Sequence, residues 1–306
     1  METTATSEKL RESAKRWQEV IRTQQARSAR YNLFVKTGLE YDDNVRLEPV
    51  NEDVGADAGD FVASVYFSGQ YKFVNTFTRK IGVGYSHYQT RHFDITEFDL
   101  IAGVFSLFYQ ERLSENLYLS LRYDPAYYIL DYENYMRRHQ LSPSLLLRFS
   151  ESRGIRFKYS YMNSKYFTDK GRTGDSYQVG ADFFSLLFAN RGELTVGVDY
   201  GKYETDDPDF THDELGARLE FTLNLPNDFK LALKADKERR RYDNIDSNSL
   251  VHRRDNKYSL GFELSHPLYY RWLELGLAYR YTNNDSNIDA YSYDKNVTGV
   301  SLSAKF

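Results

Sequence analysis

Residues 296–306 read NVTGVSLSAKF and end the chain on an aromatic side chain. Val300, Leu302, Ala304 and Phe306 fall on one face of an extended segment, and glycine, serine and lysine alternate with them. Successive side chains of a β-strand point to opposite faces, so this pattern predicts a strand with one apolar face. The same alternation recurs upstream through most of the chain, and this recurrence decides the fold.

Fourteen strand-like segments follow one another between residue 31 and the C-terminus. In the first segment, residues 31–41, Tyr31, Leu33 and Val35 alternate with polar side chains. The fourth segment, residues 96–109, is apolar on both faces in its middle, so the pattern does not assign its faces. The high content of Tyr and Phe and the low content of Pro also favour strands, which indicates an all-β fold.

The connections between these segments alternate in length. The six short connections read VNTFT, ERLSE, SESRG, ANRG, PNDF and HPLYY. The seven long connections span residues 42–59, 86–96, 124–138, 167–176, 203–213, 237–256 and 282–296. Outer-membrane barrels have short periplasmic turns and long extracellular loops. We therefore predict a transmembrane antiparallel up-and-down β-barrel of about 14 strands, rather than a soluble sandwich or propeller with shorter strands.

The composition excludes several classes of protein. The 306 residues contain no Cys, which excludes disulfides and thiolate metal sites, and the formal net charge of −4 gives no basic footprint for nucleic acid. No run of about 18 apolar residues is present, so the sequence predicts no transmembrane helix. The mean hydropathy of −0.65 is compatible with a barrel, because only alternate residues of its strands face lipid.

The N-terminal part of the chain differs from the rest, because it has the pattern of a helix. Four apolar side chains recur there at helical spacing: Leu10, Ala14, Trp17 and Ile21. We predict a short α-helix in a segment of residues 1–30, followed by a barrel of residues 31–306. The helix is a periplasmic surface helix, a plug in the barrel, or the last helix of a missing repeat domain. The first ten residues lack the apolar core of a secretory signal, so we expect a removed signal or a fragment.

Charged side chains lie opposite the apolar face in most of the segments. We predict that the following residues line the pore: Lys36, Glu40, Lys72, Arg122, Arg148, Arg156, Lys158, Asp182, Asp199, Arg218, Glu220, Lys230, Lys234, Asp236, Glu263, Glu274 and Arg280. Burying so many charges without water would be prohibitive, and fourteen strands leave room for a hydrated lumen. Basic residues cluster on the fifth to seventh strands, which favours anionic solutes, whereas carboxylates on later strands weaken that preference. The first hypothesis is therefore a porin that passes solutes.

The sequence does not predict an enzyme. His139, Ser142 and Ser144 form the only group that combines a base with nucleophiles, but alternation places His139 on the apolar face and both serines toward the lumen. His87 and His92 lack the spacing of a zinc site, and the acidic loops lack that of a calcium loop. We therefore predict no catalytic residue, no metal, no cofactor and no nucleic-acid partner.

The C-terminal strand carries the first resemblance to a known family. Gly299, Leu302, Ala304 and Phe306 are spaced in a way that resembles the assembly signal of bacterial outer-membrane β-barrels. That resemblance implies location in the outer membrane of a Gram-negative bacterium, among outer-membrane lipid and lipopolysaccharide. It also implies that the barrel assembly machinery binds the C-terminal strand.

Residues 38–49, GLEYDDNVRLEP, carry a second resemblance. They are similar to the start of the barrel in outer-membrane proteins with an N-terminal tetratricopeptide domain, such as the surface lipoprotein assembly modifiers and some polysaccharide exporters. This resemblance implies a second hypothesis, an export or translocation barrel for a polysaccharide or a surface lipoprotein, with a periplasmic partner at the N-terminal helix. The third hypothesis is a structural or adhesive barrel with a closed lumen, whose long loops bind a partner.

Overall fold

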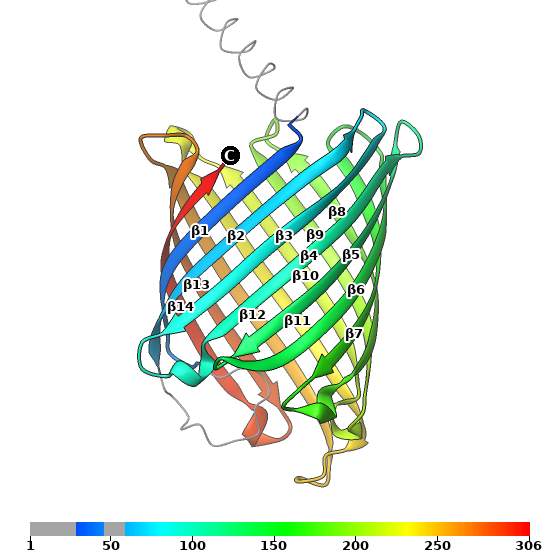
Figure 1. Cartoon of the computed structure of the whole chain (residues 1–306), viewed down its shortest axis with the longest axis vertical. Helices are drawn as coiled ribbons and strands as arrows, with labels where there is room; N and C mark the ends of the chain where they lie inside the picture. The colour runs from blue at the N-terminus through cyan, green and yellow to red at the C-terminus, as the bar shows by residue number, and fades with distance from the viewer. Residues whose placement is uncertain (1–28, 46–58) are drawn as a thin grey trace, which may run out of the picture.

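Fourteen antiparallel strands form a closed barrel in the computed structural model, which describes residues 29–45 and 59–306 (Figure 1). The strands are β1 (Tyr31–Asp42), β2 (Asp60–Asn75), β3 (Arg79–His92), β4 (Leu100–Arg112), β5 (Leu117–Leu130), β6 (Glu133–Arg148), β7 (Arg153–Tyr166), β8 (Gly174–Leu187), β9 (Gly192–Thr205), β10 (His212–Asn224), β11 (Lys230–Ile245), β12 (His252–Pro267), β13 (Leu273–Ser286) and β14 (Tyr293–Lys305). Each strand pairs with its neighbours in sequence, and β1 pairs with β14. The all-β up-and-down barrel predicted from the sequence is confirmed.

The helices of the described residues are single 3₁₀ turns between strands. They are η1 (Thr96–Phe98), η2 (Lys170–Arg172), η3 (Pro208–Phe210), η4 (Pro226–Asp228) and η5 (Asp289–Tyr291). None of the helices in this part of the chain is long and apolar enough to cross a membrane. The predicted N-terminal helix lies outside the described residues.

The last residue of the chain closes the barrel. The backbone N–H of Phe306 donates to the carbonyl of Leu33 at 2.9 Å, and the N–H of Leu33 donates to the carbonyl of Phe306 at 3.0 Å. The rings of Phe306 and Trp272 are 5.2 Å apart. These contacts extend the pairing of β14 with β1 to the chain end, which leaves no free strand edge there.

The predicted lengths of most long loops are wrong. Only the connection 43–59 is as long as expected, and the other six connections at that end contain two to seven residues. The shortest contains residues 131 and 132, which both have positive φ, as a type I′ hairpin turn requires. Residues that were predicted to be loops instead continue the strands as paired backbone. On β11 and β12 these residues are polar, because nothing outside a membrane requires an apolar outer face.

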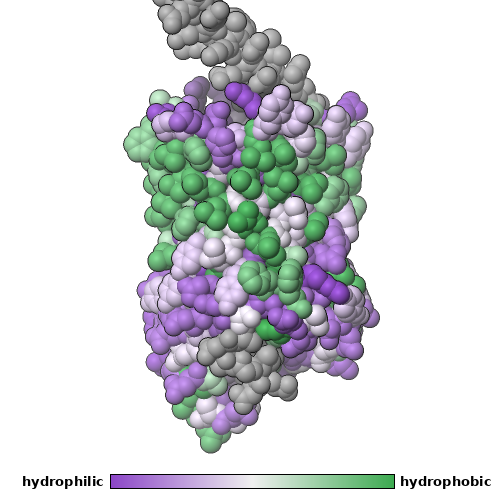
Figure 2. Space-filling view, turned by 90° about the vertical axis from the view of Figure 1, so that its left-hand side faces the viewer, coloured by the Kyte–Doolittle hydropathy of each residue, from purple (hydrophilic) through white to green (hydrophobic). Residues whose placement is uncertain are grey.

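Large apolar side chains are exposed on the outer face of every strand in one half of the barrel. Examples are Val35 on β1, Leu107 on β4, Val198 on β9 and Leu260 on β12. Figure 2 shows that hydrophobic residues gather toward the end with the C-terminus, whereas hydrophilic residues dominate toward the loop end. This exposed apolar belt is the surface that lipid covers in a membrane barrel. The loop-end half therefore extends beyond the membrane.

The register also resolves the faces of the fourth strand. Phe105 and Leu107 of β4 pair with Tyr85 and Val83 of β3, so they belong to the outer belt. Ser106 lies on the inner face and donates a hydrogen bond to Asp124 of β5 at 2.6 Å. The sequence left this strand unassigned because both of its faces are apolar near residue 104, where inward Val104 lies beside outward Phe105.

Candidate functional site

The inner face of the barrel carries the residues that the sequence predicts to line a pore. The strand register places all of them opposite the outer belt: Lys36, Glu40, Lys72, Arg122, Arg148, Arg156, Lys158, Asp182, Asp199, Arg218, Glu220, Lys230, Lys234, Asp236, Glu263, Glu274 and Arg280. The ion pair of Lys36 on β1 with Glu263 on β12, at 3.2 Å, spans strands that are not neighbours, as inward side chains can. Their role in a conducting pore stays a prediction.

Four of these residues form one charge cluster on successive strands β7 to β10. The Lys158 ammonium lies 2.9 Å from Asp182 and 3.0 Å from Asp199. The Arg218 guanidinium lies 2.7 Å from Asp182 and 3.2 Å from Asp199. Two cations thus neutralise two carboxylates, and each carboxylate is shared. We call these four residues the inner charge cluster.

Glycines on the same strands make room for the inner charge cluster. A Cβ atom on Gly180 would collide with the Asp199 carboxylate, and one on Gly197 would collide with Asp182 and approach Arg218. On Gly216 a Cβ would meet its nearest neighbour, Asp199, only at 3.8 Å. The inward glycines at 180 and 197 are therefore close-packing positions.

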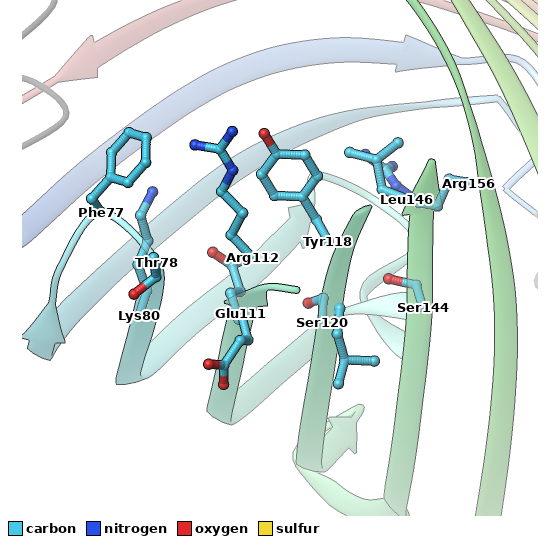
Figure 3. A pocket seen from close by; sticks show the side chains of 12 residues that line it. Phe77, Thr78, Lys80, Glu111, Arg112, Tyr118, Ser120, Ser144, Leu146 and Arg156 are labelled. Carbon is cyan, nitrogen blue, oxygen red and sulfur yellow. The ribbon is translucent and has the colours of Figure 1, made fainter. Parts of the chain in front are cut away.

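A cavity of about 460 Å³ opens on the inner face at the short-turn end. Lys80, Arg112 and Arg156 contribute cations to its lining, and Figure 3 shows Lys80, Arg112 and Tyr118 on the side of the sheet opposite to Glu111. The Arg112 guanidinium lies 4.8 Å from the ring of Phe77. By contrast, no hydrogen bond or ion pair joins Lys80 or Arg156 to another residue within 29–45 and 59–306.

A second cavity of about 310 Å³ continues from the first toward the middle of the barrel. Ser120, Ser144 and Arg156 line both cavities. The second cavity adds Arg122 and three members of the inner charge cluster, Lys158, Asp199 and Arg218. Hydroxyl groups donate hydrogen bonds to anions, and guanidinium groups pair with them. The two cavities therefore form a strip that suits negatively charged groups.

The strip belongs to a basic wall made by the inner faces of β2 to β7. Eight basic side chains lie on that wall: Lys72, Lys80, Arg112, Arg122, Arg138, Arg148, Arg156 and Lys158. Its carboxylates are Asp60, Asp124 and Glu133, of which the first and the last lie at the loop end. The basic residues that the sequence located on the fifth to seventh strands are thus part of a larger set.

The inner faces of β8 to β14 and β1 form a balanced wall. Its bases are Lys36, Arg218, Lys230, Lys234, Arg240, Arg253, Lys257, Arg280, Lys295 and Lys305. Its acids are Glu40, Asp42, Asp182, Glu193, Asp199, Glu214, Glu220, Asp236, Glu238, Asp255, Glu263 and Glu274. The two signs nearly cancel, and several of the charges are paired across strands, as Lys295 is with Asp42 at 2.6 Å.

The sequence analysis did not predict a buried ion pair at the loop end. Arg253 and Asp255 are buried, with exposed fractions of 4% and 1%, and are joined at 2.7 Å. The Arg253 guanidinium lies 3.4 Å from the ring of Tyr291 and 4.6 Å from that of Tyr242. Residues 237–256 read as a loop, so their alternation of inward and outward charges was not used; the run of Arg and Tyr is the signal that could have revealed it.

An adjacent turn is held by one carboxylate. Asp246 accepts hydrogen bonds from the backbone of Asn248 and Ser249, from the Ser249 hydroxyl at 2.9 Å and from the Tyr291 hydroxyl at 3.1 Å. Burial by itself raises the pKa of this carboxyl, but the hydrogen bonds outweigh it and lower the pKa below its usual value. The turn between β11 and β12 is therefore stabilised by an ionised Asp246.

The serines and histidine considered for catalysis are separated. His139 lies on the outer face, where its Nδ1 is 2.7 Å from the Tyr123 hydroxyl. Ser142 lies on the inner face, 3.2 Å from the Gln140 amide that donates to it. This confirms the faces assigned from alternation. Among the described residues, no group of three or more His, Cys, Asp or Glu is placed to hold a metal ion.

Comparisons with known proteins fit this architecture. The channel DcaP of Acinetobacter baumannii is 12% identical, with 90% of this chain and 96% of that chain covered and a TM-score of 0.54. OprD of Pseudomonas aeruginosa is 11% identical over 90% of this chain and 95% of that one, with a TM-score of 0.46. The likeness to DcaP shows the fold of an outer-membrane barrel. No curated protein matches the sequence. Residues 56–306 match the family model "Surface lipoprotein assembly modifier", and the chain belongs to this family.

Proposed function

We propose that the barrel forms a water-filled passage across the bacterial outer membrane. The observation that carries the proposal is the basic wall, which holds eight cations and three carboxylates on the inner face of six strands. Arg122 of this wall is paired with Asp124, and Lys158 is paired with Asp182 and Asp199 across the boundary of the wall. The remaining six cations face two carboxylates, and such an excess of charge is stable only in contact with water or with anions. A dry, side-chain-filled lumen would require partners for Lys80 and Arg156, and the described residues supply none.

We infer that the passage serves the transfer of a surface lipoprotein. Membership of the surface lipoprotein assembly modifier family supports this passenger over a polysaccharide. A lipoprotein transferred through or along the barrel needs the outer belt for its acyl chains and a wet interior for its polar part. The solute pore predicted from the sequence is the second candidate function. The basic wall favours a pore that prefers anions.

One experiment separates these functions. The full chain and a chain without residues 1–29 are reconstituted into planar bilayers to record current. The same two chains are expressed in cells that make a surface lipoprotein and lack other members of the family. A solute pore gives steady open current steps and leaves lipoprotein exposure to external protease unchanged. A translocation barrel exposes the lipoprotein at the surface only when the barrel is present. A structural barrel gives neither result, which would refute both candidates.

The C-terminal strand supports a proposal about assembly. Phe306 is exposed on its outer side and lies at the seam of the barrel, and Leu302 and Ala304 continue its face. We infer that the barrel assembly machinery binds this strand before it pairs with β1. Deletion of Phe306 is expected to lower the amount of folded barrel in the outer membrane while leaving refolding in detergent intact. Equal losses in both settings would contradict recognition by the machinery.

A further inference from the structure

Four cations lie together on the outside of the barrel. Lys237, Arg239 and Arg241 alternate on the outer face of β11, and Arg254 lies on the outer face of β12. All four side chains are exposed. No ion pair joins any of them to a carboxylate within the described parts of the chain. We call these residues the outer cation patch.

Two members of the outer cation patch oppose each other directly. Arg241 and Arg254 are register partners on adjacent antiparallel strands. Like charges at such positions destabilise a sheet. The nearest outward cation on β9 differs from them, because Lys202 forms ion pairs with Asp213, at 3.4 Å, and with Asp243. Asp213 is also the register partner of Arg241 on β10, but its ion pair is with Lys202. The barrel thus pairs one outward cation and leaves four neighbouring ones without an ion pair.

The outer cation patch lies at the edge of the outer belt. Arg239 pairs in register with Leu215, and Lys237 pairs with Tyr258, so cations and exposed apolar side chains are direct neighbours. The Lys237 ammonium lies 5.2 Å from the ring of Tyr258. Leu260 follows on the lipid side of Tyr258 and is one of the most exposed residues of the belt. This boundary is at the loop end, which in outer-membrane barrels is the outer side.

We propose that the outer cation patch binds the phosphate groups of lipid A in the outer leaflet. Planar guanidinium groups form paired hydrogen bonds to phosphate oxygens, and four adjacent cations match a headgroup that carries more than one phosphate. The acyl chains then lie on Leu215, Tyr258 and Leu260. This phosphate site anchors the barrel in lipopolysaccharide and fixes its depth. It is independent of what passes through the lumen.

The test compares lipid binding by the purified full chain and a triple variant, Arg239→Gln, Arg241→Gln and Arg254→Gln. Native mass spectrometry in detergent measures binding of bis-phosphorylated lipid A, of dephosphorylated lipid A and of phosphatidylglycerol. The full chain is expected to bind bis-phosphorylated lipid A at least about tenfold more tightly than the triple variant does, equivalent to ~1.4 kcal/mol. Dephosphorylated lipid A is expected to bind both proteins equally weakly.

A second triple variant serves as the matched control. Arg153, Arg191 and Arg271 are exposed at the short-turn end, and their replacement by Gln removes the same charge from the opposite rim. This control is expected to bind lipid A as the full chain does. Equal losses in both triple variants would show only a general charge effect and would overturn the site. Equal binding of phosphatidylglycerol and bis-phosphorylated lipid A by the full chain would overturn the assignment to lipid A.

Thermal unfolding gives a readout that does not depend on recovery of bound lipid. Removing the repulsion of Arg241 and Arg254 is expected to leave the triple variant at least as stable as the full chain in lipid-free detergent. Because a ligand stabilises only the state that binds it, lipid A is expected to raise the melting temperature of the full chain more than that of the variant. Equal shifts for both proteins would contradict the site.

Discussion

The basic wall and the balanced wall are parts of one barrel, but they differ in how many of their charged side chains form ion pairs. On the balanced wall, carboxylates and cations pair across successive strands, as Asp182 and Asp199 do with Arg218. On the basic wall, Lys80 and Arg156 line cavities and have no such partner among the described residues. The difference indicates that the balanced wall is neutralised by the protein itself, whereas the unpaired cations of the basic wall, such as Lys80 and Arg156, are neutralised by water, ions or a passenger. We therefore infer that the paired charges of the balanced wall stabilise the barrel, whereas the unpaired charges of the basic wall serve its function.

The largest expected effect comes from removing the carboxylates of the inner charge cluster. The double change Asp182→Asn and Asp199→Asn leaves Lys158 and Arg218 near each other without counter-charges. The groups are partly exposed, so we expect a loss of ~1–3 kcal/mol in the free energy of unfolding, below the value for fully buried pairs. Urea unfolding of the wild-type and variant barrels measures this loss of free energy.

The control for this change is an ion pair on the outer face. Arg79 and Glu111 are 2.8 Å apart, and the Arg79 side chain is half exposed. Glu111→Gln is expected to alter the free energy of unfolding by less than ~1 kcal/mol, as exposed pairs do. If the double change in the inner charge cluster lowers the free energy of unfolding no more than Glu111→Gln does, ion pairs do not stabilise the balanced wall.

The next effect comes from filling the space under the inner charge cluster. Gly180→Ala forces the Asp199 carboxylate to move and is expected to destabilise the barrel by ~1–3 kcal/mol, because inserted atoms strain a close-packed site. Gly216→Ala is its matched control, since its Cβ has ordinary contacts. Chemical denaturation of the two variants side by side measures the difference, and equal stabilities would argue against close packing at 180.

A smaller effect is expected at the loop end. Asp246→Asn keeps the shape of the turn but removes an ionised acceptor of four hydrogen bonds, so ~1 kcal/mol of stability is expected to be lost at pH 7. Because the folded-state pKa of Asp246 is lowered, its stabilisation is present above the unfolded pKa and disappears as pH falls through the folded pKa. Hydrogen exchange of Ser249 and Asn248 in both proteins, at pH 7 and in acid, measures it. A gap between the two proteins that persists in acid would contradict this assignment.

The smallest effect on stability is expected on the basic wall. Lys80→Gln with Arg156→Gln removes charges without ion pairs in the described residues, so the free energy of unfolding is expected to change by less than ~0.5 kcal/mol. The same change is expected to lower the preference of the lumen for anions, seen as a shift of the reversal potential in a salt gradient. Lys230→Gln with Lys234→Gln on the balanced wall is the control of equal charge. A large loss of stability in the basic-wall variant would contradict the division between the walls.

The sequence predicts the faces of the strands better than their ends. Alternation works where one face meets lipid, and it assigned inward residues such as Arg218 from their apolar neighbours. It stops at Lys237, because polar side chains occupy both faces beyond the membrane while backbone pairing continues. It also stops at Asp124, because Pro125 and the apolar and aromatic side chains on both faces of residues 126–130 hide the alternation while pairing continues. Ion pairs between strands far apart in sequence, such as Lys36 with Glu263, depend on barrel closure and have no local signal.

The basic wall was only partly visible in the sequence for the same reason. Lys80 and Arg112 flank short turns, where too few alternating residues remain to assign a face. Arg138 follows the hairpin at Asp131, which read as part of a long loop. The imbalance of charge becomes evident only when the register aligns six strands.

Single-channel recording of the full chain in a planar bilayer under a salt gradient tests the central claim most directly. A water-filled passage with one basic wall predicts steady open steps and a reversal potential that shows a preference for anions. Silence in the full chain with open steps after removal of residues 1–29 would locate a plug in that segment and retain the passage. Silence in both proteins, or a preference for cations, would contradict the account.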